Sequence, residues 1–220
     1  MEQSVKLIAI TEGAGELVGK SAQDVTSYVA RVSNPNNQMS FETGAKLIKY
    51  CITHDHWSIF EHAYVTLEIK TSRAIAAQIL RHRSFTFQEF SQRYAQAFDY
   101  VEYEARRQDS KNRQNSLDDM SEHDKEWFTE RQKELWDTSN EIYGEALQRG
   151  IAKEQARFLL PLNTATTIYM SGSLRSWIHY IQLRSGNGTQ KEHADIAILA
   201  RGIISQRFLD VAVAMEWIGE

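Results

Sequence analysis

Residues 63–70 alternate between apolar and polar side chains, and this stretch constrains the fold more strongly than any other. On an extended backbone one side would carry Ala63, Val65, Leu67 and Ile69, and the other side Tyr64, Thr66, Glu68 and Lys70. A two-residue period predicts a strand with one buried face. Thr71 or Ser72 is then placed to cap a helix that runs into Arg81-His82-Arg83.

Apolar residues at helical spacing predict several further helices. Ser21 with Asp24 is typical of a capped helix start, and Ser121 begins a long helix that ends at Gly150. We also expect helices at residues 41–54, 155–160 and 190–217, a helix from residue 174 that is stopped at residues 186–188, strands at 5–10 and 164–170, and an exposed polar loop at 106–120. The sum is an α+β fold in which helices outnumber strands.

Composition narrows the class of protein. The chain has 220 residues and only two prolines, and no Gly/Ser/Pro-rich linker divides it, so residues 1–220 are expected to form a single domain. A net charge of -4 argues against a general nucleic-acid binder. The longest uncharged run, residues 158–174, is too short and too polar to span a membrane, and the N-terminus lacks a signal peptide. We therefore expect a cytoplasmic protein.

Cys51 is the only cysteine, which excludes a disulfide framework and a Cys-rich zinc site. It lies beside the apolar stripe of a predicted helix, as a small buried hydrophobic residue would.

Two motifs suggest sites that other residues argue against. Residues 14–21, AGELVGKS, fit a loose phosphate-binding loop with Lys20, as in a P-loop nucleotide kinase, but Glu16, Leu17 and Val18 are too bulky, so a plain turn is favoured. His54-Asp55-His56, followed by Glu61-His62, resembles a zinc or iron site. No cysteine or distant acidic cluster completes a ligand set, and we expect cleft residues without a metal.

The stretch RHRSFTFQEFSQRY, residues 81–94, sets three arginines against one carboxylate. Two arginines that point in different directions can hold two anions, because a guanidinium suits phosphate and carboxylate. A salt-bridged helix end or an RNA-binding module that stacks bases on aromatic rings would also use such residues. Arg157, Arg175 and Arg184 add further cations within apolar segments, where they need a partner or a function.

The same stretch resembles the signature of the flavin-dependent thymidylate synthases: Arg-His-Arg, two variable residues, Ser, one variable, Asn-Glu, one variable, Ser, one variable, Arg. Thr86 replaces the first Ser and Gln88 the Asn. The resemblance extends over nearly the whole chain, through ARVS at 30–33, residues 54–62, RFLLPLN at 157–163 and Leu183-Arg184.

The resemblance implies the reductive methylation of dUMP to dTMP. Methylenetetrahydrofolate would supply the carbon, NADPH the electrons, and FAD would carry the hydride. It also implies a homotetramer with four active sites between subunits, and a mixed sheet flanked by helices. Neither nucleic acid nor membrane is an implied partner.

The resemblance assigns candidate site residues by position. The positions that hold dUMP in the family are here Gln78, Arg81, Glu89, Phe90, Ser91, Gln92, Arg93, Arg157 and Arg184. The positions at the FAD are Ser33, Ser58, Glu61, Arg81, His82, Arg83, Glu89, Ser173, Arg175 and His179, and His56 matches the folate and nicotinamide side. Many relatives have a flavin-contacting His in the turn at 185–190, which this chain lacks.

The chemistry favours a route without an enzyme thiolate, because Cys51 is placed beside a core stripe. Arg184 is the predicted catalytic residue, since a fixed cation can stabilise negative charge that develops on the uracil ring. Ser91 has no evident base beside it and is assigned to binding.

Overall fold

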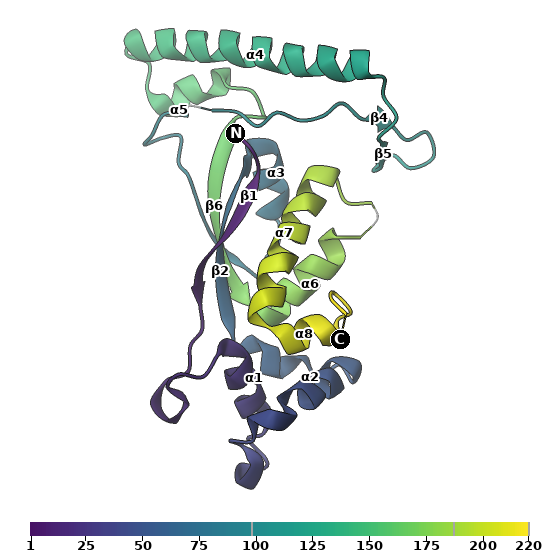
Figure 1. Ribbon diagram of the computed structural model, residues 1–220. Helices are drawn as coiled ribbons and strands as arrows, with labels where there is room; N and C mark the ends of the chain where they lie inside the picture. Colours follow the sequence, from purple (N-terminus) through teal and green to yellow (C-terminus); the bar gives the residue numbers. More distant parts are fainter. Residues whose placement is uncertain (98, 187, 220) are drawn as a thin grey trace.

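A four-stranded sheet forms the centre of the computed structural model, which describes residues 1–97, 99–186 and 188–219 (Figure 1). The strands are β1 (Ser4–Ile10), β2 (Tyr64–Ser72), β6 (Ala165–Ser173) and β3 (Thr86–Glu89), in the order β1-β2-β6-β3. Each neighbouring pair is antiparallel, so the expected mixed sheet is wrong. The reason is that β6 starts where β2 ends: the Arg73 amide, just after β2, donates to the Thr164 carbonyl, just before β6.

The sheet is covered on one face only. Val65, Leu67 and Ile69 of β2 are at most 1% exposed, which confirms the half-buried strand. Helices α3 (Arg73–Ile79), α6 (Leu174–Arg184) and α7 (Lys191–Arg207) supply much of the core on that face (Figure 1). The opposite face exposes Tyr64 and Tyr169, and the Tyr169 hydroxyl donates to Glu68 at 2.8 Å.

Serine side chains start four of the helices. Ser21 and Asp24 form a complete capping box at α1 (Ala22–Ala30), and Ser121 caps α4 (Glu122–Gln148). Ser72 and Ser173 do the same for α3 and α6, so two strands lead directly into helices. Helix α2 (Gly44–Thr53) follows a short 3-10 turn at Phe41–Thr43. The predicted starts at residues 21 and 121 are confirmed, and of Thr71 and Ser72 it is Ser72 that caps α3. Helix α3 ends at Ile79, so it does not run into Arg81-His82-Arg83 as predicted.

Helix α4 lies at one end of the elongated molecule, and α1 and α2 lie at the other (Figure 1). Helix α4 packs against α5 (Lys153–Ala156) and the 3-10 turn η5 (Arg157–Leu159). A small separate core of Tyr143, Ala146 and Ala156 joins α4 to α5. Trp127 and Leu135 of this helix are more than half exposed. Gly150 ends the helix at a φ of +82°, a conformation that glycine adopts without strain.

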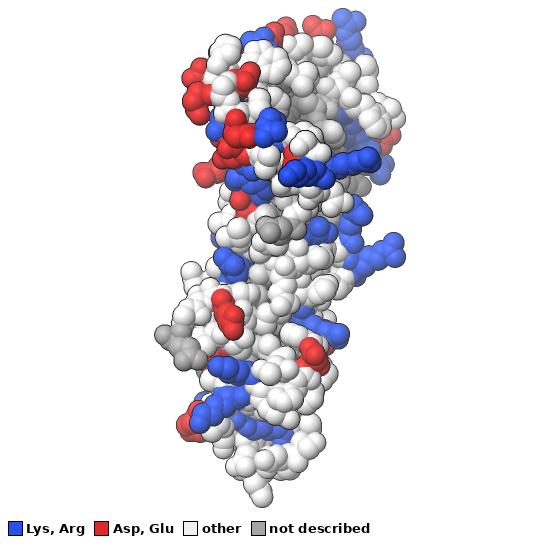
Figure 2. All heavy atoms as spheres, turned by 90° about the vertical axis from the view of Figure 1, so that its right-hand side faces the viewer, with Lys and Arg blue, Asp and Glu red and all other residues white. Residues whose placement is uncertain are grey.

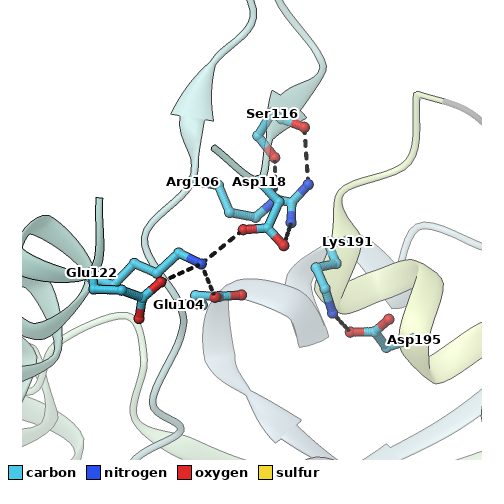
Figure 3. A network of polar contacts seen from close by, with 8 residues as sticks. Glu104, Arg106, Ser116, Asp118, Glu122, Lys191 and Asp195 are labelled. Atoms are coloured by element: carbon cyan, nitrogen blue, oxygen red, sulfur yellow. Dashed lines mark hydrogen bonds and ion pairs between the residues drawn. The ribbon is translucent and has the colours of Figure 1, made fainter. Parts of the chain in front are cut away.

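The segment 106–120 is not a plain loop as expected. It contains a short hairpin, β4 (Arg107–Gln108) with β5 (Ser116–Leu117). Polar contacts hold this hairpin in place: the Arg106 guanidinium contacts Ser116 and Asp118 (Figure 3). The Lys125 ammonium contacts Asp118, Glu104 and Glu122. Strands of two residues give no periodic signal, so the sequence pattern does not show them.

The segment 190–217 forms two helices instead of the expected one. Phe208, with φ -133°, separates α7 from α8 (Leu209–Ala214). Its side chain is fully buried, and α8 packs against α2. The four residues of β3 were not predicted either. Asn187, within the predicted helix stop, lies outside the described residues. Among the helices of the described ranges, none has the length and apolarity that crossing a membrane requires.

Candidate functional site

Arg184 and His82 form the first group of predicted site residues. Arg184 is in the last turn of α6, and His82 is in the turn after α3. The Arg184 Nε donates to the His82 Nε2 at 2.9 Å. Burial, together with the neighbouring charges of Arg184, His179 and Arg81, lowers the pKa of His82 to about 4. The imidazole is therefore neutral at pH 7 and acts as an acceptor towards the guanidinium.

A neutral partner leaves the charge of Arg184 uncompensated. Arg175 and Arg73, in contrast, pair with Glu61 at 3.0 Å and with Glu89 at 2.7 Å. Within the described parts of the chain, Arg184 has no carboxylate partner. Figure 2 shows Lys and Arg side chains along the middle of the side that carries α6 and α7, while most acidic side chains in view gather towards the α4 end. The acidic chain thus keeps a locally positive surface here.

A cavity of about 450 Å³ lies near this group. It is lined by Trp57, Glu61, Ser84, Arg175, Ser176, Ile178, His179 and Gln182. Three of these residues, Glu61, Arg175 and His179, are predicted flavin contacts. Predicted contacts Ser58 and His56 are exposed on either side of Trp57. The cavity combines the apolar surfaces of Trp57 and Ile178 with the guanidinium of Arg175. Such a lining suits a flat ring system that carries some charge.

A second cavity, of about 290 Å³, contains the other predicted arginine. It is lined by Arg73, Gln92, Arg157, Phe158, Leu160, Pro161, Leu162 and Thr164. The Gln92 Nε2 is buried without a hydrogen-bond partner, which is costly unless a ligand supplies an acceptor. The Arg157 guanidinium lies 5.5 Å from the centre of the Phe158 ring. A buried amide donor beside two arginines can bind an anion such as phosphate.

The sequence interpretation missed Arg73. It is the first residue of α3, directly after the cap Ser72, and its guanidinium holds Glu89. Thr166 donates to the same carboxylate oxygen at 3.0 Å. In the sequence, the only local indication of a role for Arg73 is its position after a strand and a capping serine. The pairing of Arg73 with Glu89 is seen only in the folded structure.

Other predicted residues lie near Gln92. Glu89, Phe90 and Ser91 line a third cavity, of about 520 Å³, which also includes Glu68 and Lys70 of β2 and Thr167 and Tyr169 of β6 and so lies on the open face of the sheet. Arg93 pairs with Glu154 at 3.0 Å, and the Ser91 hydroxyl accepts from the Arg93 amide. Ser91 therefore sits in a turn beside charged groups, and its hydroxyl faces no histidine that the structure describes as a hydrogen-bond partner.

The remaining predicted residues do not line the three cavities described above. Arg81, Arg83 and Ser33 are exposed, and Ser173 is buried as the cap of α6. Gln78 contacts His193 and Gln190. Within one described chain, the cavity that contains Arg157 does not include Arg81 or Arg184. The predicted dUMP residues thus form at least two groups in a single subunit.

The alternative motifs serve the fold. The Lys20 ammonium lies 4.2 Å from the centre of the Phe41 ring, and the Ser21 hydroxyl is engaged with Asp24. Cys51 is buried, and desolvation raises the pKa of its thiol. In the described ranges no group of three or more His, Cys, Asp and Glu side chains is arranged to hold a metal ion.

Comparison with known proteins shows the family to which nearly the whole chain can be matched. The family model described as Thymidylate synthase complementing protein matches residues 6–208. A probable flavin-dependent thymidylate synthase of Paramecium bursaria Chlorella virus 1 is 55% identical over 216 residues, covering 98% of this chain and 100% of the relative. The chain belongs to the thymidylate synthase complementing protein family. A flavin-dependent thymidylate synthase of Synechocystis sp. is 54% identical, covering 97% of this chain and 99% of its own.

A solved structure supports the fold of this family member. The crystal structure of a UMP/dUMP methylase PolB from Streptomyces cacaoi, bound with 5-Br dUMP, superimposes with a TM-score of 0.83 at 22% identity. The match covers 99% of this chain and 96% of the other. The overall fold is therefore shared with a solved structure of low sequence identity.

Proposed function

We propose that the chain is a flavin-dependent thymidylate synthase that methylates dUMP to dTMP reductively, with methylenetetrahydrofolate as carbon donor and NADPH as reductant. Two relatives, named as a probable flavin-dependent thymidylate synthase and a flavin-dependent thymidylate synthase, are 55% and 54% identical to the chain over almost their full length. The structural observation that carries the proposal is Arg184, a cation fixed by a neutral imidazole and left without a carboxylate among the described residues.

Arg184 is the proposed catalytic residue. Adding a hydride or a carbon unit to uracil requires that negative charge on the ring be stabilised. A guanidinium that is already oriented stabilises such charge without reorganisation, and the effect is large in a site with little water. His82 orients Arg184 while adding no negative charge, so the full charge of Arg184 remains available to the ring.

FAD, when bound, would carry the hydride from NADPH to the pyrimidine. The cavity beside Arg175 suits such a ring system, because Trp57 and Ile178 offer apolar surface and Arg175 offers a cation. We propose that Arg81 and Arg83, which are exposed and do not line this cavity, bind the pyrophosphate. We propose that Glu61 keeps Arg175 in place through their 3.0 Å ion pair. His56 would lie towards the folate and nicotinamide.

The proposed route uses no enzyme thiolate. Cys51 is buried within the core, and its raised pKa favours the unreactive thiol over the thiolate.

We further propose that the active site is completed by other subunits of a homotetramer. Phe158 and Leu162, which line the cavity with Arg157, are 75% and 76% exposed, and α4 exposes Trp127 and Leu135. Apolar side chains at this exposure favour association. Burying them against a second copy would bring the Arg157 group of one subunit to the Arg184 group of another, so that one dUMP contacts both.

Mixed oligomers test this arrangement. Arg157→Ala and Arg184→Ala are each expected to abolish the release of tritium from 5-tritiated dUMP. If the two side chains serve one site from different subunits, reassembling an equal mixture restores about a quarter of the wild-type activity, because random pairing makes about one intact site in four. An unchanged, inactive mixture would place both arginines in the same subunit's site.

FAD binding and tritium release from labelled dUMP test the activity itself. We expect the purified protein to bind FAD and to release tritium from labelled dUMP only when reductant and folate are present. Lys20→Ala is the matched control: it removes a cation that contacts Phe41, and it would abolish activity only in a P-loop kinase. Protein that cannot be loaded with FAD would refute the proposed function.

A further inference from the structure

His193 is a buried titratable residue to which the proposed reaction gives no role. It lies in the first turns of α7, its side chain is 0% exposed, and it stands between α6 and α3. Its Nε2 is 3.1 Å from the Tyr180 hydroxyl, and its Nδ1 is 3.3 Å from the Gln78 Oε1. A fully buried histidine with both ring nitrogens in hydrogen-bonding contact fixes the groups on either side of it.

The contacts continue beyond Gln78. The Gln78 Nε2 donates to the Gln190 Oε1 at 2.6 Å, and the Gln190 Nε2 donates to the Glu192 Oε2 at 2.8 Å. Five side chains thus form one line, which we call the Gln78 chain. It consists of Tyr180, His193, Gln78, Gln190 and Glu192.

The carboxylate at one end gives the Gln78 chain a direction. An ionised Glu192 only accepts hydrogen bonds, so Gln190 must turn its NH₂ towards Glu192 and its oxygen towards Gln78. Gln78 then turns its own NH₂ to Gln190 and its oxygen to His193. His193 consequently carries its proton on Nδ1, and its Nε2 accepts from the Tyr180 hydroxyl.

The neutral state of His193 fits this direction. Burial and the nearby charge of Arg184 lower the pKa of His193 to about 3, so the imidazole offers one donor and one acceptor at pH 7. Each contact of the Gln78 chain then pairs one donor with one acceptor, and rotating the Gln78 amide by half a turn breaks its contacts with His193 and Gln190.

One orientation of Gln78 distinguishes two pyrimidines. After its two contacts, the carboxamide retains one N–H and one oxygen lone pair. The edge of uracil offers a carbonyl acceptor beside the N3–H donor, while cytosine offers an amino donor beside the N3 acceptor. An amide free to rotate pairs with either edge, whereas a fixed amide presents its donor and its acceptor in one order only.

We propose that His193 and Glu192 are positioning residues that hold the Gln78 carboxamide in the orientation that pairs with uracil, and that they thereby make the site select dUMP over dCMP. This inference rests on the proposed function, because it takes Gln78 to face the substrate base.

Glu192→Gln tests the proposal at a partly exposed position where folding is not at stake. A carboxamide at residue 192 can donate as well as accept, so it removes the direction but keeps the size. Dissociation constants for dUMP and dCMP are measured by equilibrium dialysis on FAD-loaded protein. We expect the wild-type preference for dUMP to fall about tenfold or more, the scale of one misdirected hydrogen bond.

Kinetics add a second readout. Because the amide contributes to binding, the KM for dUMP is expected to rise more than kcat falls. Asp195→Asn is the matched control, since Asp195 lies on the same helix and pairs with Lys191 at 2.6 Å, outside the Gln78 chain. Its preference for dUMP should equal that of the wild type.

Tyr180→Phe removes the donor at the other end of the Gln78 chain and keeps the buried ring. It should lower the dUMP preference in the same way. Wild-type protein that binds dUMP while Glu192→Gln and Tyr180→Phe keep its full preference over dCMP would overturn the proposal and leave the proposed function intact. Wild-type protein that binds no dUMP would overturn both.

Discussion

Gly172 in β6 lies against the ring of Phe85. This contact gives a quantitative test of the packing beneath residues 81–94, which we call the signature segment. A Cβ at residue 172 would be 2.5 Å from the Phe85 Cδ1 and 2.7 Å from the Cε1, well inside van der Waals contact. The ring has little room to move, because it packs against Trp177 and Tyr180 at centroid distances of 4.8 and 5.9 Å. We therefore expect Gly172→Ala to destabilise the protein.

The expected loss follows from the cost of adding a methyl group to a filled core, about 1–3 kcal/mol. For a chain of this length each kcal/mol lowers the Tm by about 2–4 °C, so the Tm should fall by about 2–12 °C. Gly202→Ala in α7 is the control: nothing lies within 4 Å of its Cβ, and alanine favours the helix by about 1 kcal/mol.

The packing argument is tested by measuring the Tm of both variants and of the double variant Phe85→Leu/Gly172→Ala. Space made by the smaller side chain should recover part of the loss, which a double-mutant cycle reports as a coupling energy. Because Phe85 lies between Arg83 and Glu89, Gly172→Ala should also weaken dUMP binding. A Gly172→Ala protein as stable as Gly202→Ala would refute the packing argument.

Two further predictions concern titratable groups. Cys51→Ala should fold and keep thymidylate synthase activity, measured by tritium release, since a buried thiol with a raised pKa is no nucleophile; loss of activity in folded protein would restore a thiolate mechanism. His82 and His193 have folded-state pKa values of about 4 and about 3, below the ordinary 6.5. The unfolded chain therefore binds more protons between these values, so stability is full above pH 6.5 and falls as the pH drops towards 4. Melting curves from pH 7.5 to 5 should show this fall, and a smaller one for His193→Gln; a Tm that rises on acidification would contradict the neutral imidazoles.

The strongly periodic parts of the fold were predictable from the sequence. The alternation in residues 63–70 gave β2 and its buried face, and the serine caps gave the starts of α1, α3 and α4. The short strand β3 was not predictable in this way, because four residues carry little pattern and β3 exists through its pairing with β6. The break at Phe208 likewise depends on the burial of one side chain against the rest of the core.

The site divides in the same way. The arginines and Gln78 were assigned to the site from the resemblance to the family, which is read from residue types in order along the chain. Arg73 and His193 were missed because their roles lie in partners distant in sequence: Glu89 is 16 residues from Arg73, and Gln78 is 115 residues from His193. A lone histidine in an apolar helix resembles a core residue until its two ring nitrogens have partners.

The one carboxylate of the signature segment does not neutralise the arginines of that segment. This carboxylate, Glu89, pairs with Arg73 outside the segment, and Arg93 pairs with Glu154. Burial lowers the pKa of His82 most, and the charges of Arg184 and Arg81 lower it further, so two cations lie near one neutral ring. Like charges brought together raise the energy of the folded chain, and binding an anion relieves it. The fold therefore favours an anion at this position, because Glu89 and Glu154 are already paired with other arginines.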